Sequence, residues 1–121
     1  MVQRMGTGMI EHFRFGSMTI DGRQYQSDLK IVDGEVVPNW WRREGHWADV
    51  MDMQDILDAC PDILVVGMGS PGRMNVAEEL RQVLAERGIR LIEEPTDDAV
   101  HSFNRYWEAG RKVAGAFHLT C

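Results

Sequence analysis

The feature that most constrains the fold is a four-residue apolar run at 63–66, Ile-Leu-Val-Val, which a glycine-rich segment follows directly. A run without polar alternation is typical of a β-strand that is covered on both faces. A helical pattern precedes it, with apolar residues on one face over 53–60, and we expect Asp52 to cap that helix. The run therefore predicts a buried strand in a sheet that carries helices.

The rest of the C-terminal half continues the same alternation. A second helix is expected from a cap at Asn75 to Gly88, and a short strand follows over 89–92. Thr96 is the expected cap of a third helix, and a last strand covers 113–119. Alternation of helices and strands predicts an α/β fold in which helices pack on a central sheet.

The N-terminal third carries turn signals instead. Asp21-Gly22 lies between two short apolar runs, which is a strong indication of a β-hairpin. Asp33-Gly34 marks a second turn before a short extended segment. Residues 1–12 have no clear period and are predicted to be a flexible N-terminal arm. No linker divides the chain, so we expect residues 1–121 to form a single domain.

The net charge and the hydropathy of the chain limit which partners it can bind and where in the cell it is expected. The net charge is −6, with 13 Lys and Arg against 19 Asp and Glu, which disfavours nucleic acid and anionic membrane surfaces. No stretch approaches the roughly 20 apolar residues that cross a bilayer, so we expect no direct membrane insertion and a cytoplasmic protein. Two cysteines, Cys60 and Cys121, are too few for a disulfide framework, although a single bridge between them stays open.

The segment Gly67-Met68-Gly69-Ser70-Pro71-Gly72 fits the pattern G-x-G-x-x-G between a predicted strand and a helix. Glycines of this kind let a backbone approach a phosphate, as in dinucleotide-binding folds. Only one half of such a fold would fit after residue 62, and Pro71 removes one N–H donor. We therefore favour a tight structural turn; binding of an anion, a small polar ligand or a nucleotide at Gly67, Gly69 and Ser70 is the alternative.

The second binding candidate is the segment 39–49, which has no helical or strand period and carries three of the four tryptophans. We expect an ordered loop packed by its own aromatic rings. Trp41 and Arg42, with His46 nearby, are able to hold a flat or anionic group or to anchor a protein partner. The alternative is that the rings cover the edge of the core and Arg42 pairs with a local carboxylate.

No catalytic or metal-binding pattern is present. The four histidines lack metal-ligand spacing, and Ser70 is not part of a G-x-S-x-G nucleophile turn. His118 is interpreted as a partly buried histidine with its hydrogen bonds satisfied. The sequence therefore predicts no catalytic residues, no metal and no cofactor.

Three segments resemble a known family: Trp41-Arg42 with Gly45-His46, the stretch 64–69, and the C-terminal stretch 113–121. Together they are similar to the small domain shared by the adipogenesis-associated protein and mitochondrial complex I assembly factor 3. The resemblance implies a three-layer α/β/α arrangement around a mixed sheet, and it implies that Gly72 is incidental to the glycine turn. The family has no established catalytic residues.

The mitochondrial relative acts in the assembly of a membrane complex. The resemblance and the missing catalytic pattern together favour a non-enzymatic protein-interaction or complex-assembly module with a protein partner. We expect a monomer or a weak homodimer. The alternative hypothesis is a small-ligand binding protein or enzyme that uses the Gly67–Gly72 turn.

Overall fold

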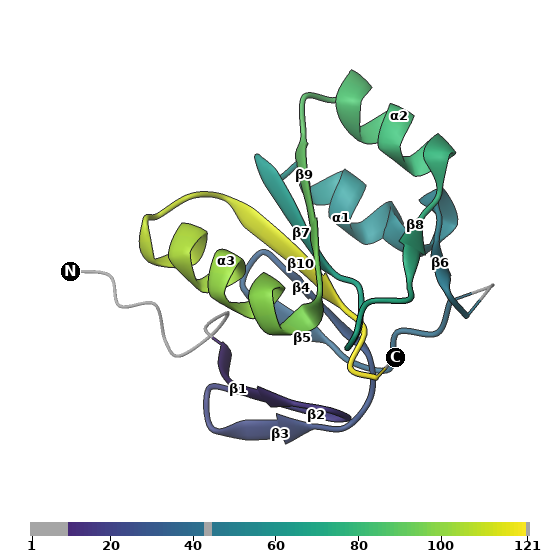
Figure 1. Cartoon of the computed structure of the whole chain (residues 1–121). Helices are drawn as coiled ribbons and strands as arrows, with labels where there is room; N and C mark the ends of the chain where they lie inside the picture. Colours follow the sequence, from purple (N-terminus) through teal and green to yellow (C-terminus); the bar gives the residue numbers. More distant parts are fainter. Residues whose placement is uncertain (1–9, 43–44, 121) are drawn as a thin grey trace.

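Five strands form the central sheet of the computed structural model, which describes residues 10–42 and 45–120 (Figure 1). They are β4 (Leu29–Val32), β5 (Glu35–Val37), β7 (Ile63–Gly67), β9 (Arg90–Glu94) and β10 (Val113–Phe117). Their order across the sheet is β5-β4-β10-β7-β9. The strands β10, β7 and β9 run parallel, whereas β4 and β5 are antiparallel to their neighbours. The sheet is thus mixed, and the predicted α/β class is confirmed.

Helices cover both faces of this sheet and make three layers (Figure 1). One face carries the 3₁₀-helix η1 (Val50–Met53), α1 (Gln54–Ala59) and α2 (Glu78–Glu86). The other face carries α3 (Thr96–Glu108) and a small antiparallel sheet of β1 (Ile10–Arg14), β2 (Ser17–Ile20) and β3 (Arg23–Tyr25). Two short strands, β6 (Trp47–Ala48) and β8 (Asn75–Val76), form a separate parallel pair.

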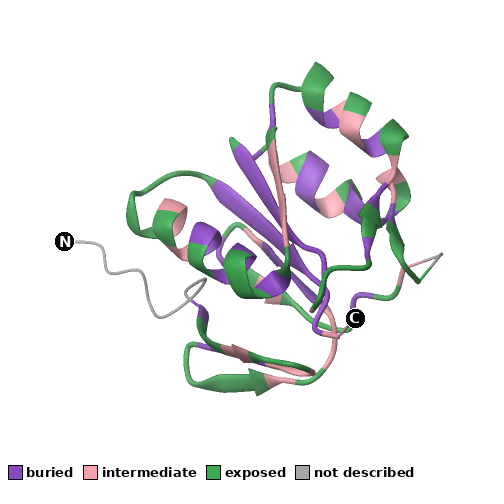
Figure 2. Ribbon diagram, viewed as in Figure 1, coloured by how far each residue is buried: buried purple, intermediate pink, exposed green. Residues whose placement is uncertain are grey.

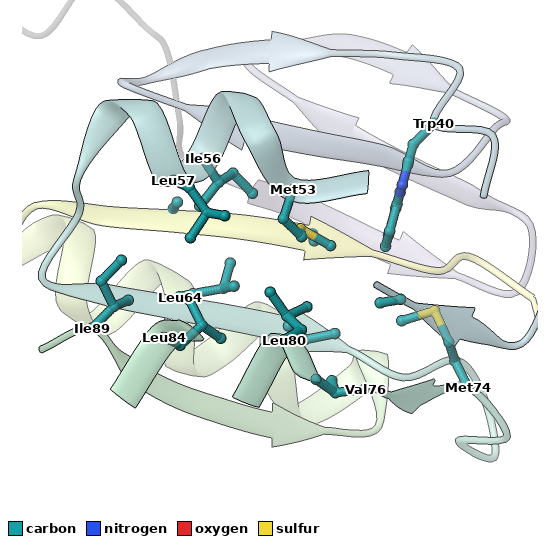
Figure 3. Close-up of a cluster of buried hydrophobic side chains, with 14 of the residues drawn as sticks. Trp40, Met53, Ile56, Leu57, Leu64, Met74, Val76, Leu80, Leu84 and Ile89 are labelled. Carbon is teal, nitrogen blue, oxygen red and sulfur yellow. The ribbon is translucent and has the colours of Figure 1, made fainter. Parts of the chain in front are cut away.

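The alternation of side chains along β7 divides the apolar residues into two cores. Leu64 and Val66 face α1 and α2, whereas Ile63 and Val65 face α3 and the small sheet. All residues of β7 are buried, as Figure 2 shows for the centre of the sheet. Figure 3 shows the first core, in which Trp40 lies at the end nearest Met74. Full burial of each large aliphatic side chain stabilises the fold by about 1.5–3 kcal/mol.

The start of the first helix differs from the prediction. Asp49, not Asp52, is the cap: its side chain accepts a hydrogen bond from the Asp52 backbone N–H at 3.2 Å. Asp52 is three residues further on, and its side chain accepts from the Asp49 N–H at 3.0 Å. This reciprocal pair is a capping box, and it adds a turn of 3₁₀-helix before α1.

Asn75 and Thr96, the other two predicted caps, do not cap their helices. Asn75 lies in β8, where its N–H donates to the His46 carbonyl at 2.7 Å, so α2 begins only at Glu78. The residue that precedes α3 is Pro95, and the Thr96 hydroxyl bonds outside the helix. At Thr96 a long-range contact takes the hydroxyl that a local cap would have used, whereas at Asn75 strand pairing keeps the residue out of the helix.

The predicted N-terminal arm, residues 1–12, overlaps the start of β1. Ile10 is buried at the start of β1, and both its N–H and its carbonyl bond to the Asn104 side chain on α3. Residues 10–12 therefore belong to the small sheet, and residues 1–9 lie outside the described part of the chain.

Cys60 is exposed, and Cys121 also lies outside the described residues, which leaves their pairing untested. Within the described ranges, no helix has the length and apolar character that a membrane span requires.

Candidate functional site

The candidate site lies where β7 and β10 end side by side. The two strands are parallel, and Phe117 pairs with Gly67 at their carboxyl ends. The glycine turn leaves β7 there, and His118 follows β10 directly. Crevices beyond the carboxyl ends of parallel strands are the usual ligand positions in open α/β sheets.

Asp28, just before β4, joins three segments at this place. Its Oδ2 accepts from Arg42 Nη1 and from His118 Nδ1, each at 2.7 Å. Its Oδ1 accepts the backbone N–H of Leu119 at 2.8 Å. One carboxylate thus ties Arg42, from the segment 39–49 that we call the tryptophan loop, and the C-terminal segment to the start of β4. We call Asp28, Arg42 and His118 the Asp28 cluster.

The charge state of Asp28 shows which atoms of the cluster donate hydrogen bonds and which accept them. Burial raises the pKa of Asp28, but the hydrogen bonds from His118, the Leu119 N–H and Arg42 outweigh it and hold that pKa below the ordinary value. An ionised carboxylate only accepts hydrogen bonds, so His118 Nδ1 is the donor in this pair. Arg42 Nη2 lies 3.2 Å from the same Nδ1, and this contact therefore brings two donors together.

Arg42 is held by further contacts. Its Nε donates to the Gly45 carbonyl at 2.6 Å, and its guanidinium lies over the Trp40 ring, 4.7 Å from the centroid. The Arg42 side chain is only 7% exposed. A guanidinium that is stacked on an indole and bonded to a carboxylate has a fixed orientation.

The two neighbouring tryptophans behave differently. Trp40 is buried in the core between the sheet and α1, whereas Trp41 is 83% exposed. Two hollows flank this pair. One, of about 460 Å³, is lined by Val37, Trp41 and Met51 among others. The other, of about 380 Å³, is lined by Trp41 with Asp28, Arg42 and Thr120, and we call it the Arg42 hollow.

The glycine turn is bonded to the rest of the fold through its backbone. The Gly69 N–H donates to Thr96 Oγ1 at 2.9 Å, and that hydroxyl donates to the His118 carbonyl at 2.7 Å. The Ser70 N–H donates to the Thr120 carbonyl at 2.9 Å. The amides of Gly69 and Ser70 therefore already have acceptors within the protein. Binding of an anion at this turn stays a prediction.

Glycine is required at three positions in this turn, for two different reasons. A Cβ atom on Gly67 would lie 2.9 Å from both the Phe117 ring and Thr96 Oγ1, so only glycine permits their close approach. Gly69 and Gly72 have φ of 102° and 109°, a conformation that side chains rarely adopt. Gly72 is therefore not incidental to the turn, contrary to what the family resemblance implied. Both observations explain the glycines by packing and backbone geometry.

The six residues predicted as binding candidates gather around 118–120. Arg42 contacts His118, and the exposed His46 lies with its ring centroid 6.0 Å from that of His118. Gly67 and Ser70 bond to this segment through the backbone, whereas Gly69 reaches it through Thr96. Trp41 reaches it only across the Arg42 hollow, whose wall includes Thr120.

Sequence reasoning missed Asp28 and His118 as members of the site. Asp28 belongs to no motif, because its partners are distant in sequence and no local spacing marks it. His118 is buried as predicted, but its Nε2 has no hydrogen-bond partner among the described residues. The signal that pointed to it was its place in the C-terminal stretch that carries the family resemblance.

Comparison with known proteins gives one family and several structural neighbours. A family model described as a protein of unknown function (DUF498/DUF598) matches residues 10–118. The solved structure of the protein MT938 is 28% identical, covers 93% of this chain and 98% of its own, and superposes with a TM-score of 0.78. The conserved hypothetical protein PH1505 from Pyrococcus horikoshii OT3 is 25% identical over 93% of this chain and 98% of its own, with a TM-score of 0.81.

A third structure extends the comparison of the fold. A Bordetella pertussis protein described as a Mth938-like domain is 18% identical, with 98% of this chain and 90% of its own covered and a TM-score of 0.67. At that identity the similarity concerns the fold alone. The fold of this chain is therefore Mth938-like.

Proposed function

We propose that this chain, which belongs to the DUF498/DUF598 family of proteins of unknown function, is a non-enzymatic protein-interaction module that binds a partner through Trp41. The observation that carries the proposal is the contrast between Trp41 and its neighbours. Trp41 is 83% exposed, but Trp40 before it is packed in the core and Arg42 after it is held by Asp28. A large ring on a fixed backbone loses little conformational freedom on binding.

The surface around Trp41 has the composition of a contact surface. Met51 is 64% exposed, and Val37 is the last residue of the edge strand β5. Both line the same hollow as Trp41. We call these three residues the Trp41 patch. Tryptophan and methionine are enriched at the centres of protein interfaces, and tryptophan is among the residues that contribute most binding energy. A concave apolar surface of this kind suits an apolar side chain of a partner protein.

Two further considerations support an interaction role. The resemblance to the complex I assembly factor 3 domain points to assembly, a function that needs a partner surface and no catalytic group. The alternative, a small-ligand binding protein or enzyme that uses the Gly67–Gly72 turn, has less support. The amides of Gly69 and Ser70, which such a ligand would need, already donate to Thr96 and Thr120.

The test is affinity capture from the native cell with three forms of the tagged chain. Trp41→Ala removes the centre of the patch, and Phe15→Ala is the matched control, since Phe15 is 61% exposed in the turn between β1 and β2. We expect the wild type and Phe15→Ala to retain the same protein, and Trp41→Ala to lose it. Loss of about 2 kcal/mol, the threshold for a hot-spot residue, weakens binding roughly thirtyfold. Equal retention by all three forms would overturn the proposal.

A further inference from the structure

We propose that the Arg42 hollow binds a carboxylate group and that the guanidinium of Arg42 donates the hydrogen bonds that hold it. The hollow shares Trp41 with the Trp41 patch, but its hydrogen-bond donors are those of Arg42, so the proposal can be tested without a protein partner. Its basis is the number of N–H donors that Arg42 carries and the number of acceptors that surround them.

A guanidinium has five N–H donors. In Arg42, Nε uses its single donor on the Gly45 carbonyl, and Nη1 uses one on Asp28 Oδ2. The neighbour of Nη2 is His118 Nδ1, which is itself a donor to Asp28. Among the described residues, no acceptor is therefore recorded for the two hydrogens of Nη2 or the second hydrogen of Nη1.

These donors belong to a side chain that has little access to bulk water. The Arg42 side chain is 7% exposed, and it forms part of the wall of a hollow of about 380 Å³. Buried donors without acceptors are rare in native proteins and are normally satisfied by a bound water or a ligand. A ligand oxygen in the Arg42 hollow would supply the missing acceptor.

Charge favours a carboxylate over a phosphate as the group bound. Asp28 and Arg42 already form a neutral ion pair at 2.7 Å. A second anion adds charge beside Asp28, and a monoanion adds less than the −1.5 to −2 of a phosphate monoester. The planar pair of oxygens in a carboxylate also matches the planar edge of a guanidinium.

The remainder of the wall indicates what the carboxylate is attached to. The exposed Trp41 ring borders the hollow, and Ser27 and Thr120 contribute polar groups. The volume lies within the range of about 300–1,000 Å³ that accommodates small molecules. A compact planar acid would place its carboxylate at Arg42 and its ring against Trp41. A glutamate side chain of a peptide offers the same carboxylate, and the experiment separates these two sources.

The experiment is an NMR titration of the ¹⁵N-labelled chain that follows Arg42 Nε–H and the Trp41 indole N–H. The probes are benzoate, its uncharged match benzamide, inorganic phosphate, and acetyl-glutamate amide. We expect saturable shifts of both signals with benzoate. Benzamide should bind more weakly by at least about tenfold, because hydrogen bonds between charged groups are the stronger class. Phosphate should also bind more weakly, because it places more negative charge beside Asp28. Acetyl-glutamate amide that binds as well as benzoate identifies a peptide as the source; preference for benzoate identifies a free acid.

Two variants locate the binding. Gln26→Trp fills the hollow from an exposed position on its wall and leaves all three residues of the Asp28 cluster unsubstituted, and Gln82→Trp, exposed on α2, is its control. We expect the first to weaken benzoate binding by roughly tenfold or more and the second to leave it unchanged. Absence of saturable shifts at Arg42 and Trp41, equal binding of benzamide, or wild-type affinity in Gln26→Trp would each overturn the proposal and leave water alone in the hollow.

Discussion

His118 Nδ1 donates to the Asp28 carboxylate at 2.7 Å, although the two residues are separated by 90 positions in the sequence. This bond joins the end of β10 to the start of β4, and Arg42 completes the cluster from the tryptophan loop. The loop therefore has a defined position relative to the sheet. The exposure of Trp41, one residue before Arg42, is a consequence of that position.

Replacement of Asp28 by asparagine tests the cluster as a source of stability. Asp28→Asn keeps the shape but leaves Arg42 as a buried cation without its counter-ion. Loss of one partner of a buried ion pair typically costs about 3–5 kcal/mol, and the partial exposure of Asp28 reduces this to an expected loss of about 2–3 kcal/mol in the free energy of unfolding. Urea denaturation measures it.

The control for this prediction is Asp33→Asn. Asp33 is exposed and has φ of 52°, a conformation that asparagine also tolerates. We expect a change within about 0.5 kcal/mol. Similar losses in the two variants would show that the Asp28 cluster has no special part in stability.

The low pKa of Asp28 predicts that the stability difference between wild type and Asp28→Asn depends on pH. The pKa of Asp28 is lower in the folded chain than its ordinary value of 3.8, because hydrogen bonds from His118, Leu119 and Arg42 outweigh the effect of burial. Such a carboxyl group contributes stability above the unfolded pKa, and this contribution is lost as the pH falls through the folded pKa. We expect the stability difference between wild type and Asp28→Asn to be constant near neutral pH and to shrink below about pH 4. A difference that grows on acidification would contradict this assignment.

The central elements of the fold were predictable because they depend on local patterns. The apolar run over 63–66 indicated a buried strand, and β7 is buried on both faces. The capping residues were less predictable, since Asn75 and Thr96 have side chains that suit a helix start equally well. Asn75 stays outside the helix because its N–H pairs with the His46 carbonyl. Thr96 does not cap because its hydroxyl donates to the His118 carbonyl. Neither contact leaves a trace in the nearby sequence.

The candidate site was predictable only in part. Arg42 and His46 stood out because an unusual aromatic loop carries them. Asp28 did not stand out, because its role depends on partners 14 and 90 residues away. The glycines were found by their motif, but the reason for Gly67 is the approach of Phe117, which only the tertiary structure reveals.

Gly67→Ala tests whether close packing is the reason for the first glycine. The added methyl group would lie 2.9 Å from the Phe117 ring and 3.3 Å from the Thr96 backbone. Overpacking of this kind costs about 1–3 kcal/mol, which a shift of the thermal unfolding midpoint measures. Gly45→Ala is the control, because a Cβ atom there meets nothing within 4 Å. An unchanged midpoint in Gly67→Ala would refute the packing explanation.

Thr96→Val tests the hydroxyl that connects the glycine turn to His118. Valine keeps the shape of the side chain but leaves the Gly69 N–H and the His118 carbonyl without their partner. We expect a loss of about 1–3 kcal/mol and faster hydrogen exchange of the Gly69 amide. Thr96→Ser retains the hydroxyl and should preserve slow exchange. Equal exchange rates in the two variants would argue against the role given to this bond.

Site-specific photo-crosslinking in the native cell tests the interaction role most directly. A photoreactive phenylalanine analogue at position 51 places the reactive group on the Trp41 patch and keeps Trp41 itself, and the same analogue at position 15 reports a surface of similar exposure on the hairpin. The proposed role predicts one discrete protein adduct from position 51 that position 15 does not give. Adducts from neither position, or the same adducts from both, would contradict a partner surface at Trp41.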